Sequence, residues 1–229
     1  MLATEPGQLT QRIKAAALES GAVVAGIADL ATTVADPLYA LVFGLRYLDA
    51  AVERLPVDDA LDRAAEELST ATQRIYVIVE HILRESGDNV RCCRYDSVES
   101  VFGAPCTLSQ KALAVLAGLG WIGKSSLLVT PDHGPRVRLG TLFTDAALVA
   151  DDPFPTNNCG HCHVCREACP VGAVTEEAVS FRRFSAYRID ADRCRAHVWR
   201  NLPGGGKREF CGVCLKECPF GRQRLAAGM

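Results

Sequence analysis

Eight of the 11 cysteines in this chain of 229 residues lie after residue 150, and their spacing limits the possible folds more than any other feature. Two-residue spacers let one loop place three thiolates around an iron–sulfur cubane, while a further cysteine, followed by proline, serves a second cubane. The first run is Cys159-x2-Cys162-x2-Cys165-x3-Cys169-Pro170, and the second is Cys194, a long gap and Cys211-x2-Cys214-x3-Cys218-Pro219.

The two runs together predict two [4Fe–4S] clusters, and this assignment uses every cysteine after residue 150. The ligands of the first cluster would be Cys159, Cys162, Cys165 and Cys218. The ligands of the second cluster would be Cys169, Cys194, Cys211 and Cys214.

Zinc and disulfides are the alternatives for these cysteines. Zinc sites favour four ligands in two separated pairs, whereas three cysteines here follow one another at two-residue spacing and both runs end in Cys-Pro. Disulfides require an oxidising compartment, and the amino-terminal sequence Met-Leu-Ala-Thr-Glu-Pro lacks the charged and apolar segments of a signal peptide. Both alternatives fit less well than two clusters, and we expect a cytoplasmic protein.

Two further features lie within the cysteine region. His161 and His163 stand between ligands, and we expect them to be exposed loop residues or hydrogen-bond donors to ligands rather than ligands themselves. Residues 195–210 separate Cys194 from Cys211 and carry four basic side chains. We expect a solvated surface loop there, with a docking loop for an acidic partner as the alternative.

Composition and charge set broader limits. The chain is 48% hydrophobic and 23% charged, which is typical of a globular protein with room for two modest domains. No apolar run approaches the about 20 residues of a membrane span, so we expect no membrane partner. The formal net charge of −2 would become more negative with clusters bound, which disfavours sequence-independent binding of nucleic acid.

The sequence divides near residue 150, where the turn-rich segment 151–155 (Asp-Asp-Pro-Phe-Pro) indicates a linker. Residues 1–150 alternate between helical and strand patterns, and residues 151–229 carry the clusters. Apolar periodicity and turn residues predict helices at 8–20 and from 59 to near 87, strands at 23–28, 39–45 and 90–95, and at 136–149 either one strand or two strands with a break at Gly140. A capping box, Thr107-x-x-Gln110, indicates the start of another helix.

A glycine-rich stretch covers residues 118–126 and reads Gly-Leu-Gly-Trp-Ile-Gly-Lys-Ser-Ser. Glycines beside an aromatic residue let a backbone approach a ligand closely, and a lysine adds positive charge. The stretch fits a loop that holds a flat or phosphate-bearing cofactor through Gly120, Trp121, Ile122, Gly123 and Lys124. A helix C-cap followed by a tight turn fits these residues equally well.

The stretch Ala-Gly-Leu-Gly-Trp-Ile-Gly-Lys at 117–124, followed by a strand and the Cys-Gly-x-Cys-x2-Cys-x3-Cys-Pro run, resembles the epoxyqueuosine reductases and their relatives, the reductive dehalogenases. The resemblance covers roughly residues 105–219. It implies an α+β protein with a nitroreductase-like α/β domain followed by a two-cluster ferredoxin-like domain. It also implies a corrinoid such as cobalamin in the α/β domain, clusters that feed single electrons to it, and an external donor of ferredoxin or flavodoxin type.

The sequence departs from this family at one expected catalytic position. The epoxyqueuosine enzymes carry an acidic residue where this chain has Ala104. Tyr95, Asp96 and Glu99 are the alternatives for a proton donor, so no catalytic residue is assigned. Larger members of the family continue into a helical-repeat region associated with tRNA, which this sequence does not include, and a tRNA substrate is therefore not favoured over a small molecule.

Two functions follow from the sequence. The first is an iron–sulfur oxidoreductase that resembles epoxyqueuosine reductase and passes electrons through both clusters to a cofactor in the α/β domain. The alternative is a non-catalytic electron carrier of the dicluster ferredoxin type, or a subunit of a redox complex.

Three cysteines outside the runs, Cys92, Cys93 and Cys106, are expected to be small buried hydrophobic residues, with a reactive or metal-binding role as the alternative.

Overall fold

The computed structural model describes residues 5–31, 39–55, 60–87, 92–94, 109–175, 189–200 and 211–222. The chain forms two compact units that interleave along the sequence. The first unit consists of Met1–Leu45, Ser69–Gly120 and Arg138–Pro155, and the second consists of Arg46–Leu68, Trp121–Val137 and Thr156–Met229. The unit that carries the cysteine runs therefore includes two segments that precede residue 150, a more complex division than the predicted domains 1–150 and 151–229.

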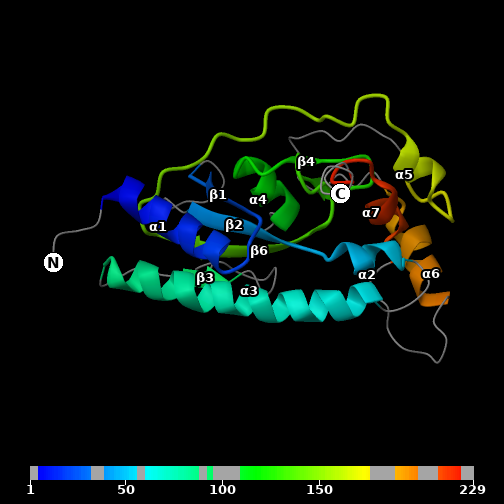
Figure 1. The fold of residues 1–229 in the computed structure, drawn as a ribbon. Helices are drawn as coiled ribbons and strands as arrows, with labels where there is room; N and C mark the ends of the chain where they lie inside the picture. Colours follow the sequence, from blue (N-terminus) through cyan, green and yellow to red (C-terminus); the bar gives the residue numbers. More distant parts are fainter. Residues whose placement is uncertain are drawn as a thin grey trace. The chain divides into compact units, whose positions relative to one another are not determined.

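A four-stranded sheet in the order β1-β2-β6-β3 forms the framework of the first unit (Figure 1). Its strands, from one edge to the other, are β1 (Val24–Asp29), β2 (Tyr39–Arg46), β6 (Val137–Thr144) and β3 (Cys92–Arg94). β1 is antiparallel to β2, and β3 is antiparallel to β6. β2 carries no charged side chain before its last residue, Arg46, and all of its residues except the first and last are buried, as expected for an inner strand.

The neighbouring inner strand β6 runs through Gly140 without the break that the sequence left open. A methyl group on Gly140 would lie 2.4 Å from the ring of Phe43, so the position must be glycine for packing rather than for bending. Phe43 also meets the ring of Tyr76 edge-on at 5.6 Å, and the hydroxyl of Tyr76 accepts a hydrogen bond of 3.1 Å from the N–H of Thr141. These contacts fasten helix α3 (Ala60–Glu85) to the sheet.

Helices α1 (Pro6–Glu19) and α4 (Gln110–Leu116) pack on β1, on the side of the sheet opposite α3 (Figure 1). α1 presents buried residues at intervals of four, Leu9, Ile13 and Ala17, as an amphipathic helix does. The apolar periodicity in the sequence thus predicted this helix to within two residues at each end.

The ends of α4 correct one prediction and decide another. The N-cap is Ser109, whose Oγ accepts a hydrogen bond of 3.2 Å from the N–H of Ala112, so the predicted capping box at Thr107 was wrong. At the other end Gly118 adopts φ of 72°, and its N–H donates to the carbonyl oxygen of Val115 at 3.1 Å. Gly118 therefore follows the C-cap residue Ala117 as the glycine that ends the helix, one of the two roles that the glycine-rich stretch allowed.

The predicted linker after residue 150 is bonded into the first unit. Asp151 accepts hydrogen bonds from Lys14 Nζ at 2.8 and 2.9 Å and from the N–H of Ile27 at 2.7 Å. The N–H of Phe154 donates to the carbonyl oxygen of Val115 at 2.9 Å. This segment thus ties α1, β1 and α4 together rather than forming a free connection.

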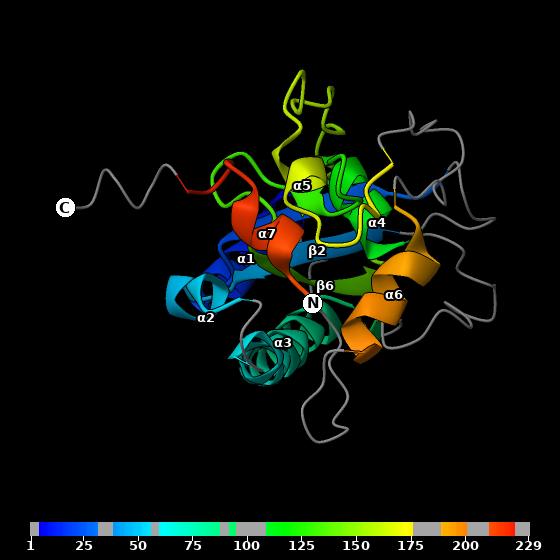
Figure 2. The same ribbon diagram turned by 90° about the vertical axis from the view of Figure 1, so that its right-hand side faces the viewer.

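Apart from the first part of α3, up to Leu68, the second unit consists of short elements. They are α2 (Asp49–Glu53), the antiparallel pair β4 (Trp121–Ile122) and β5 (Leu128–Val129), α5 (Val164–Glu167), α6 (Ala191–Arg200) and α7 (Val213–Glu217). α5 packs beside α7, and α2 also contacts α7 (Figure 2). Their small core contains Tyr47, Val52, Leu55, Ala64, Ala65 and Leu215.

α6 corrects the prediction for the segment after Cys194. Residues 195–200 are helical rather than part of a surface loop, and residues 201–210 lie outside the described residues. In the ranges that the structure describes, no helix is both long and apolar enough to cross a membrane.

Candidate iron–sulfur centre

The four cysteines predicted for the first cluster line one small cavity of the second unit. Cys159, Cys162 and Cys165 reach it from the turn before α5 and from α5 itself, and Cys218 reaches it from the end of α7. The cavity measures about 20 Å³, and the rest of its wall consists of Gly123, Lys124, Ser125, Val129, Pro219 and Phe220. The structure therefore brings together side chains that are more than fifty positions apart in the sequence.

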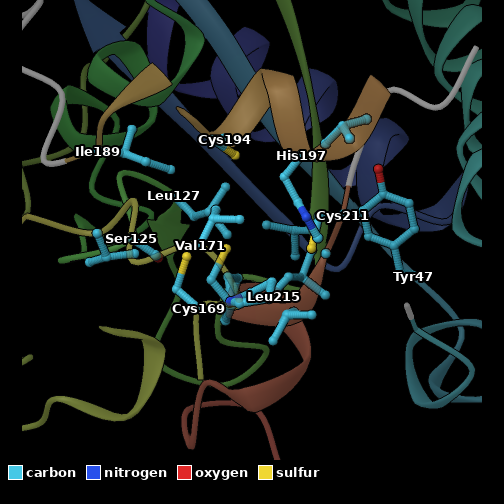
Figure 3. A pocket seen from close by; sticks show the side chains of 18 residues that line it. Tyr47, Ser125, Leu127, Cys169, Val171, Ile189, Cys194, His197, Cys211 and Leu215 are labelled. Carbon is cyan, nitrogen blue, oxygen red and sulfur yellow. The ribbon is translucent and has the colours of Figure 1, made fainter. Parts of the chain in front are cut away.

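The other four cysteines, Cys169, Cys194, Cys211 and Cys214, line a second cavity of about 260 Å³. Figure 3 shows Cys169, Cys194 and Cys211 arranged around this space. The remaining wall is mainly apolar and includes Leu127, Pro135, Val137, Val171, Val174, Ile189, Val198 and Leu215. Each predicted set of four cysteines, here called the first and the second quartet, thus has a cavity of its own.

The choice between zinc and a cluster depends on the cysteine spacing in the sequence. Within the described ranges, no three His, Cys, Asp or Glu side chains gather as closely as a single metal ion requires. Zinc sites favour ligands in two separated pairs, whereas each run here ends in Cys-Pro and the first run has three cysteines at successive two-residue spacings.

Burial controls the acid–base state of several cysteines in both quartets. Desolvation, with a smaller contribution from neighbouring thiolates, raises the pKa of Cys214 to about 12 and the pKa of Cys218 to about 11. The same causes raise the pKa of Cys165 and Cys194. Four thiolates cannot share such a site as anions unless a cationic group lies among them, and bound iron would supply that charge. The donor chemistry therefore fits iron–sulfur clusters.

The glycine-rich loop contacts the first quartet. Trp121 is only 1% exposed, and its indole N–H donates to Cys159 Sγ at 3.4 Å. Lys124 Nζ donates to the carbonyl oxygen of Cys162 at 2.9 Å. A methyl group on Gly123 would lie 3.4 Å from the same Cys159 Sγ and 2.8 Å from a neighbouring valine, which explains the glycine there. The binding of a second cofactor by residues 120–124 stays a prediction, whereas these contacts place the loop beside the cysteines.

The segment that carries Cys218 is held by Arg136, a residue that no sequence motif singled out. Arg136 is fully buried, and its guanidinium donates to the carbonyl oxygens of Lys216 and Phe220, each at 2.8 Å. Longer contacts of 3.5 Å reach the carbonyl oxygen of Cys218. Burial lowers the pKa of Arg136, whereas a charge on Cys218 raises it. The arginine thus fixes the backbone on both sides of a ligand.

A close crossing of two backbones holds the same segment. Gly134 adopts φ of 56°, and a methyl group on it would meet the Phe220 carbonyl oxygen at 2.0 Å. Gly221, with φ of 82°, is equally tight against the backbone of His133. The two backbone segments approach each other closely because neither glycine carries a side chain.

Two side chains beside the second quartet were missed in the sequence. His197 lies three residues after Cys194 on α6, and Figure 3 shows its imidazole directed toward Cys211. Tyr47 lines the same cavity. The spacing of Cys194 and His197 is a usable signal, since residues three apart share one face of a helix. Tyr47 offers no such signal because it is remote in sequence from all eight cysteines.

The remaining predicted residues divide into two groups. His161 and His163 are exposed, as expected for loop residues that are not ligands. The side chains of Cys92 and Cys93 on β3 lie outside the described residues. So do Tyr95, Asp96, Glu99, Ala104, Cys106 and Thr107.

Comparison with known proteins supports two [4Fe–4S] clusters and relates most of the cysteine region to one domain type. Residues 158–221 match the 4Fe-4S double cluster binding domain. The chain is 42% identical over 120 residues to an epoxyqueuosine reductase of Synechococcus sp. (strain RCC307), which covers 49% of this chain and 34% of that protein. It is 35% identical over 120 residues to the tetrachloroethene reductive dehalogenase of Sulfurospirillum multivorans, and the match covers 48% of this chain and 23% of that protein.

Two solved structures show the likeness in fold. One is a reductive dehalogenase from work on B12-dependent dehalogenation, with a TM-score of 0.74 and 22% identity over 98% of this chain and 34% of that chain. The other is an epoxyqueuosine reductase with an epoxyqueuosine-modified tRNA stem loop. Its TM-score is 0.59 and its identity is 20%, over 94% of this chain and 66% of that chain. This chain spans about a third of the length of the curated epoxyqueuosine reductases that it matches. Within that span, the chain resembles the epoxyqueuosine reductases and the reductive dehalogenases, and its cysteine region matches a domain that binds two 4Fe-4S clusters.

Proposed function

We propose that this protein is an oxidoreductase of the epoxyqueuosine reductase kind, with a cluster-binding unit that supplies electrons to a cofactor of the first unit. Two complete cysteine quartets, each lining its own cavity within the matched double cluster domain, carry the proposal. When bound, [4Fe–4S] clusters take up and release single electrons. We assign the two quartets as the ligands of the two clusters.

The protein's own residues prepare the two sites differently. The first quartet receives an indole N–H bond from Trp121 and lies beside the cationic side chains of Lys124 and Arg136. The second quartet receives an N–H bond of 3.2 Å from Ala173 to Cys169 Sγ and is otherwise surrounded mainly by apolar side chains. Hydrogen bonds, charge and solvent exposure all tune reduction potentials, so the two clusters would differ in potential.

The cofactor that receives the electrons is, in our proposal, a corrinoid. The support is the likeness in fold to the reductive dehalogenase that was studied for B12-dependent dehalogenation. The corresponding part of this chain would be a nitroreductase-like domain within residues 1–150. The glycine-rich loop is engaged with the first quartet, and we assign no residue to hold the corrinoid.

The proposed partners follow from the same assignment. A cytoplasmic ferredoxin or flavodoxin would reduce the clusters one electron at a time. The substrate would be a molecule that loses oxygen or halogen on reduction, either a small molecule or, as in the solved relative, a modified tRNA stem loop.

The test begins with anaerobic purification and cluster reconstitution. About eight irons and eight sulfides per chain, with reduced-cluster signals in electron paramagnetic resonance (EPR), are expected for two cubanes. Titration with cobalamin should then give a saturable change in the corrinoid spectrum, and reduced protein should convert an epoxyqueuosine-containing stem loop or a halogenated phenol.

Each stage has its own decisive outcome. Zinc in place of iron, or far fewer than eight irons, would refute the cluster assignment. Full cluster content without any corrinoid binding or turnover would instead favour a non-catalytic electron carrier.

A further inference from the structure

Arg136 is unusual among the buried residues of the second unit. It has no exposed surface, and it is the only charged residue among the largest fully buried side chains that the structure describes. A buried charge is costly unless a charge of opposite sign compensates it. The surroundings of Arg136 must therefore account for its charge.

The carboxylates of the described residues compensate this charge only weakly. The hydrogen bonds of the guanidinium end on backbone carbonyl oxygens, those of Lys216, Cys218 and Phe220. Its Nε has no hydrogen-bond partner among the described residues. Asp49 and Glu53 exert weaker electrostatic effects on Arg136 than Cys218 does. Carbonyl dipoles satisfy the donors but do not neutralise the charge.

The nearest candidate for the missing negative charge is the first quartet. Cys218 lines the first cavity, and the guanidinium lies against the backbone carbonyl oxygen of that same residue. A [4Fe–4S] core with four thiolates has net negative charge, and reduction adds one more electron. A fixed positive charge nearby stabilises the reduced form more than the oxidised form, and low dielectric strengthens the effect.

We propose that Arg136 is the buried counter-charge of the cluster held by Cys159, Cys162, Cys165 and Cys218, and that it selectively raises the reduction potential of that cluster. The inference rests on the proposed cluster ligation and assigns Arg136 a positioning and electrostatic role, not a catalytic one. Arginine suits the task because its planar fork can donate to several carbonyls while it stays charged.

A second arginine supplies a matched control. Arg222 Nε donates to the carbonyl oxygen of Lys216 at 3.1 Å, the same acceptor that Arg136 uses. Arg222, however, is 40% exposed and pairs with Glu217 at 2.9 Å. Replacing it removes a hydrogen bond from the same segment without removing a buried charge.

The experiment compares the wild-type chain with Arg136→Gln, Arg136→Lys and Arg222→Gln after anaerobic reconstitution. Iron content is measured first, and the midpoint potential of each cluster then follows from dithionite titration monitored by EPR. A Cys194→Ala variant, which should retain the first cluster alone, assigns the signals.

We expect Arg136→Gln to lower the midpoint potential of the first cluster while that of the second cluster stays unchanged. Arg136→Lys should shift the potential less. Arg222→Gln should also shift it less than Arg136→Gln does, because the charge of Arg222 is partly exposed and paired with Glu217. A fully loaded Arg136→Gln protein with an unchanged first potential would overturn the inference. Equal shifts in Arg136→Gln and Arg136→Lys would overturn it too, because they would make the guanidinium geometry, not the charge, responsible.

If the Arg136→Gln protein does not bind the first cluster, the Arg136→Lys variant tests the inference instead. Retention of that cluster in Arg136→Lys would support the need for a charge, and loss in both variants would contradict it. Wild-type protein without iron would refute the cluster ligation itself and is thereby distinguished from failure of the inference about Arg136.

Discussion

Trp121 differs from an ordinary buried aromatic residue by the direction of one N–H group. Its ring meets Phe220 edge-on at 4.9 Å, which is normal core packing. The indole N–H, however, points at Cys159 Sγ from 3.4 Å. Hydrogen bonds to ligand sulfur stabilise the more negative, reduced state of a cluster. The indole N–H can therefore influence the reduction potential of the first cluster, whereas the ring contributes to the stability of the fold.

Replacement of Trp121 by Phe should lower the midpoint potential of the first cluster, because the ring remains apolar but the N–H is lost. Redox titration monitored by EPR measures the shift, with the second cluster as an internal reference. Phe220→Leu is the control, since it removes the ring contact and keeps the indole N–H. A shift of equal size in both variants would mean that packing, not the hydrogen bond, sets the potential.

Gly134 supports a second prediction about a single residue. Gly134→Ala should destabilise the protein by more than the about 1–2 kcal/mol that a left-handed alanine costs, because its methyl would also strike the Phe220 carbonyl oxygen. Gly160→Ala is a matched control, with φ of 48° and open space around the new methyl. Anaerobic urea unfolding of both holo variants measures the difference, and equal losses would contradict the steric argument.

Among the elements, the pair formed by β2 and β6 depends on one missing side chain. Gly140 of β6 lies against the ring of Phe43 in β2, which in turn packs on Tyr76 of α3. Overpacking of a well-filled core forces side chains and backbone to move. The sheet and the helix that covers it therefore have little room to adjust at this point.

Gly140→Ala should lower the free energy of unfolding by about 1–3 kcal/mol, the usual cost of overpacking. Gly7→Ala in α1 provides the comparison, because nothing lies within 4 Å of its new methyl and alanine favours a helix by up to about 1 kcal/mol over glycine. Thermal unfolding followed by circular dichroism should give opposite signs for the two variants. A stabilising Gly140→Ala would show that the contact with Phe43 relaxes at no cost.

The elements that the sequence predicted well are those with a strong local pattern. The apolar run of β2 and the amphipathic face of α3 identified both elements to within about one or two residues at most of their ends. α6 was missed although a local signal existed, since Asp190 Oδ1 caps it by accepting the N–H of Arg193 at 2.9 Å. α4 was predicted from the wrong cap because Thr107 and Ser109 offer the same hydroxyl chemistry.

For the whole molecule, the interleaving of the two units is the main feature that no local pattern could predict. Arg46–Leu68 and Trp121–Val137 join the cysteine-bearing segment through contacts between distant positions. Lys216 Nζ, for example, donates to the carbonyl oxygens of Glu53 and Leu55 at 2.6 and 3.1 Å. The spacing of residues in the sequence does not predict such hydrogen bonds. The cysteine quartets were predictable because iron–sulfur chemistry fixes their spacing, whereas Arg136 and Tyr47 have no comparable motif.

In the assignment, the last cysteine of each run serves the cluster of the other run, which leads to a prediction about the molecule as a whole. Cys218→Ala should lower iron content from about eight to about four per chain and remove only the first cluster's signal. Cys194→Ala should remove only the second cluster's signal. Iron analysis with EPR on each variant tests the pairing. Loss of the second cluster in Cys218→Ala would contradict the assignment of Cys218 to the first quartet.

The late position of Cys218 in the chain has a consequence for how the protein is made. The ribosome releases Cys159, Cys162 and Cys165 well before Cys218, and the arginine that fixes the 216–220 backbone has to wait for the same segment. A nascent chain would thus offer iron only three of the four corners of the first site. Iron delivery to a complete first site therefore has to follow synthesis of the α7 region.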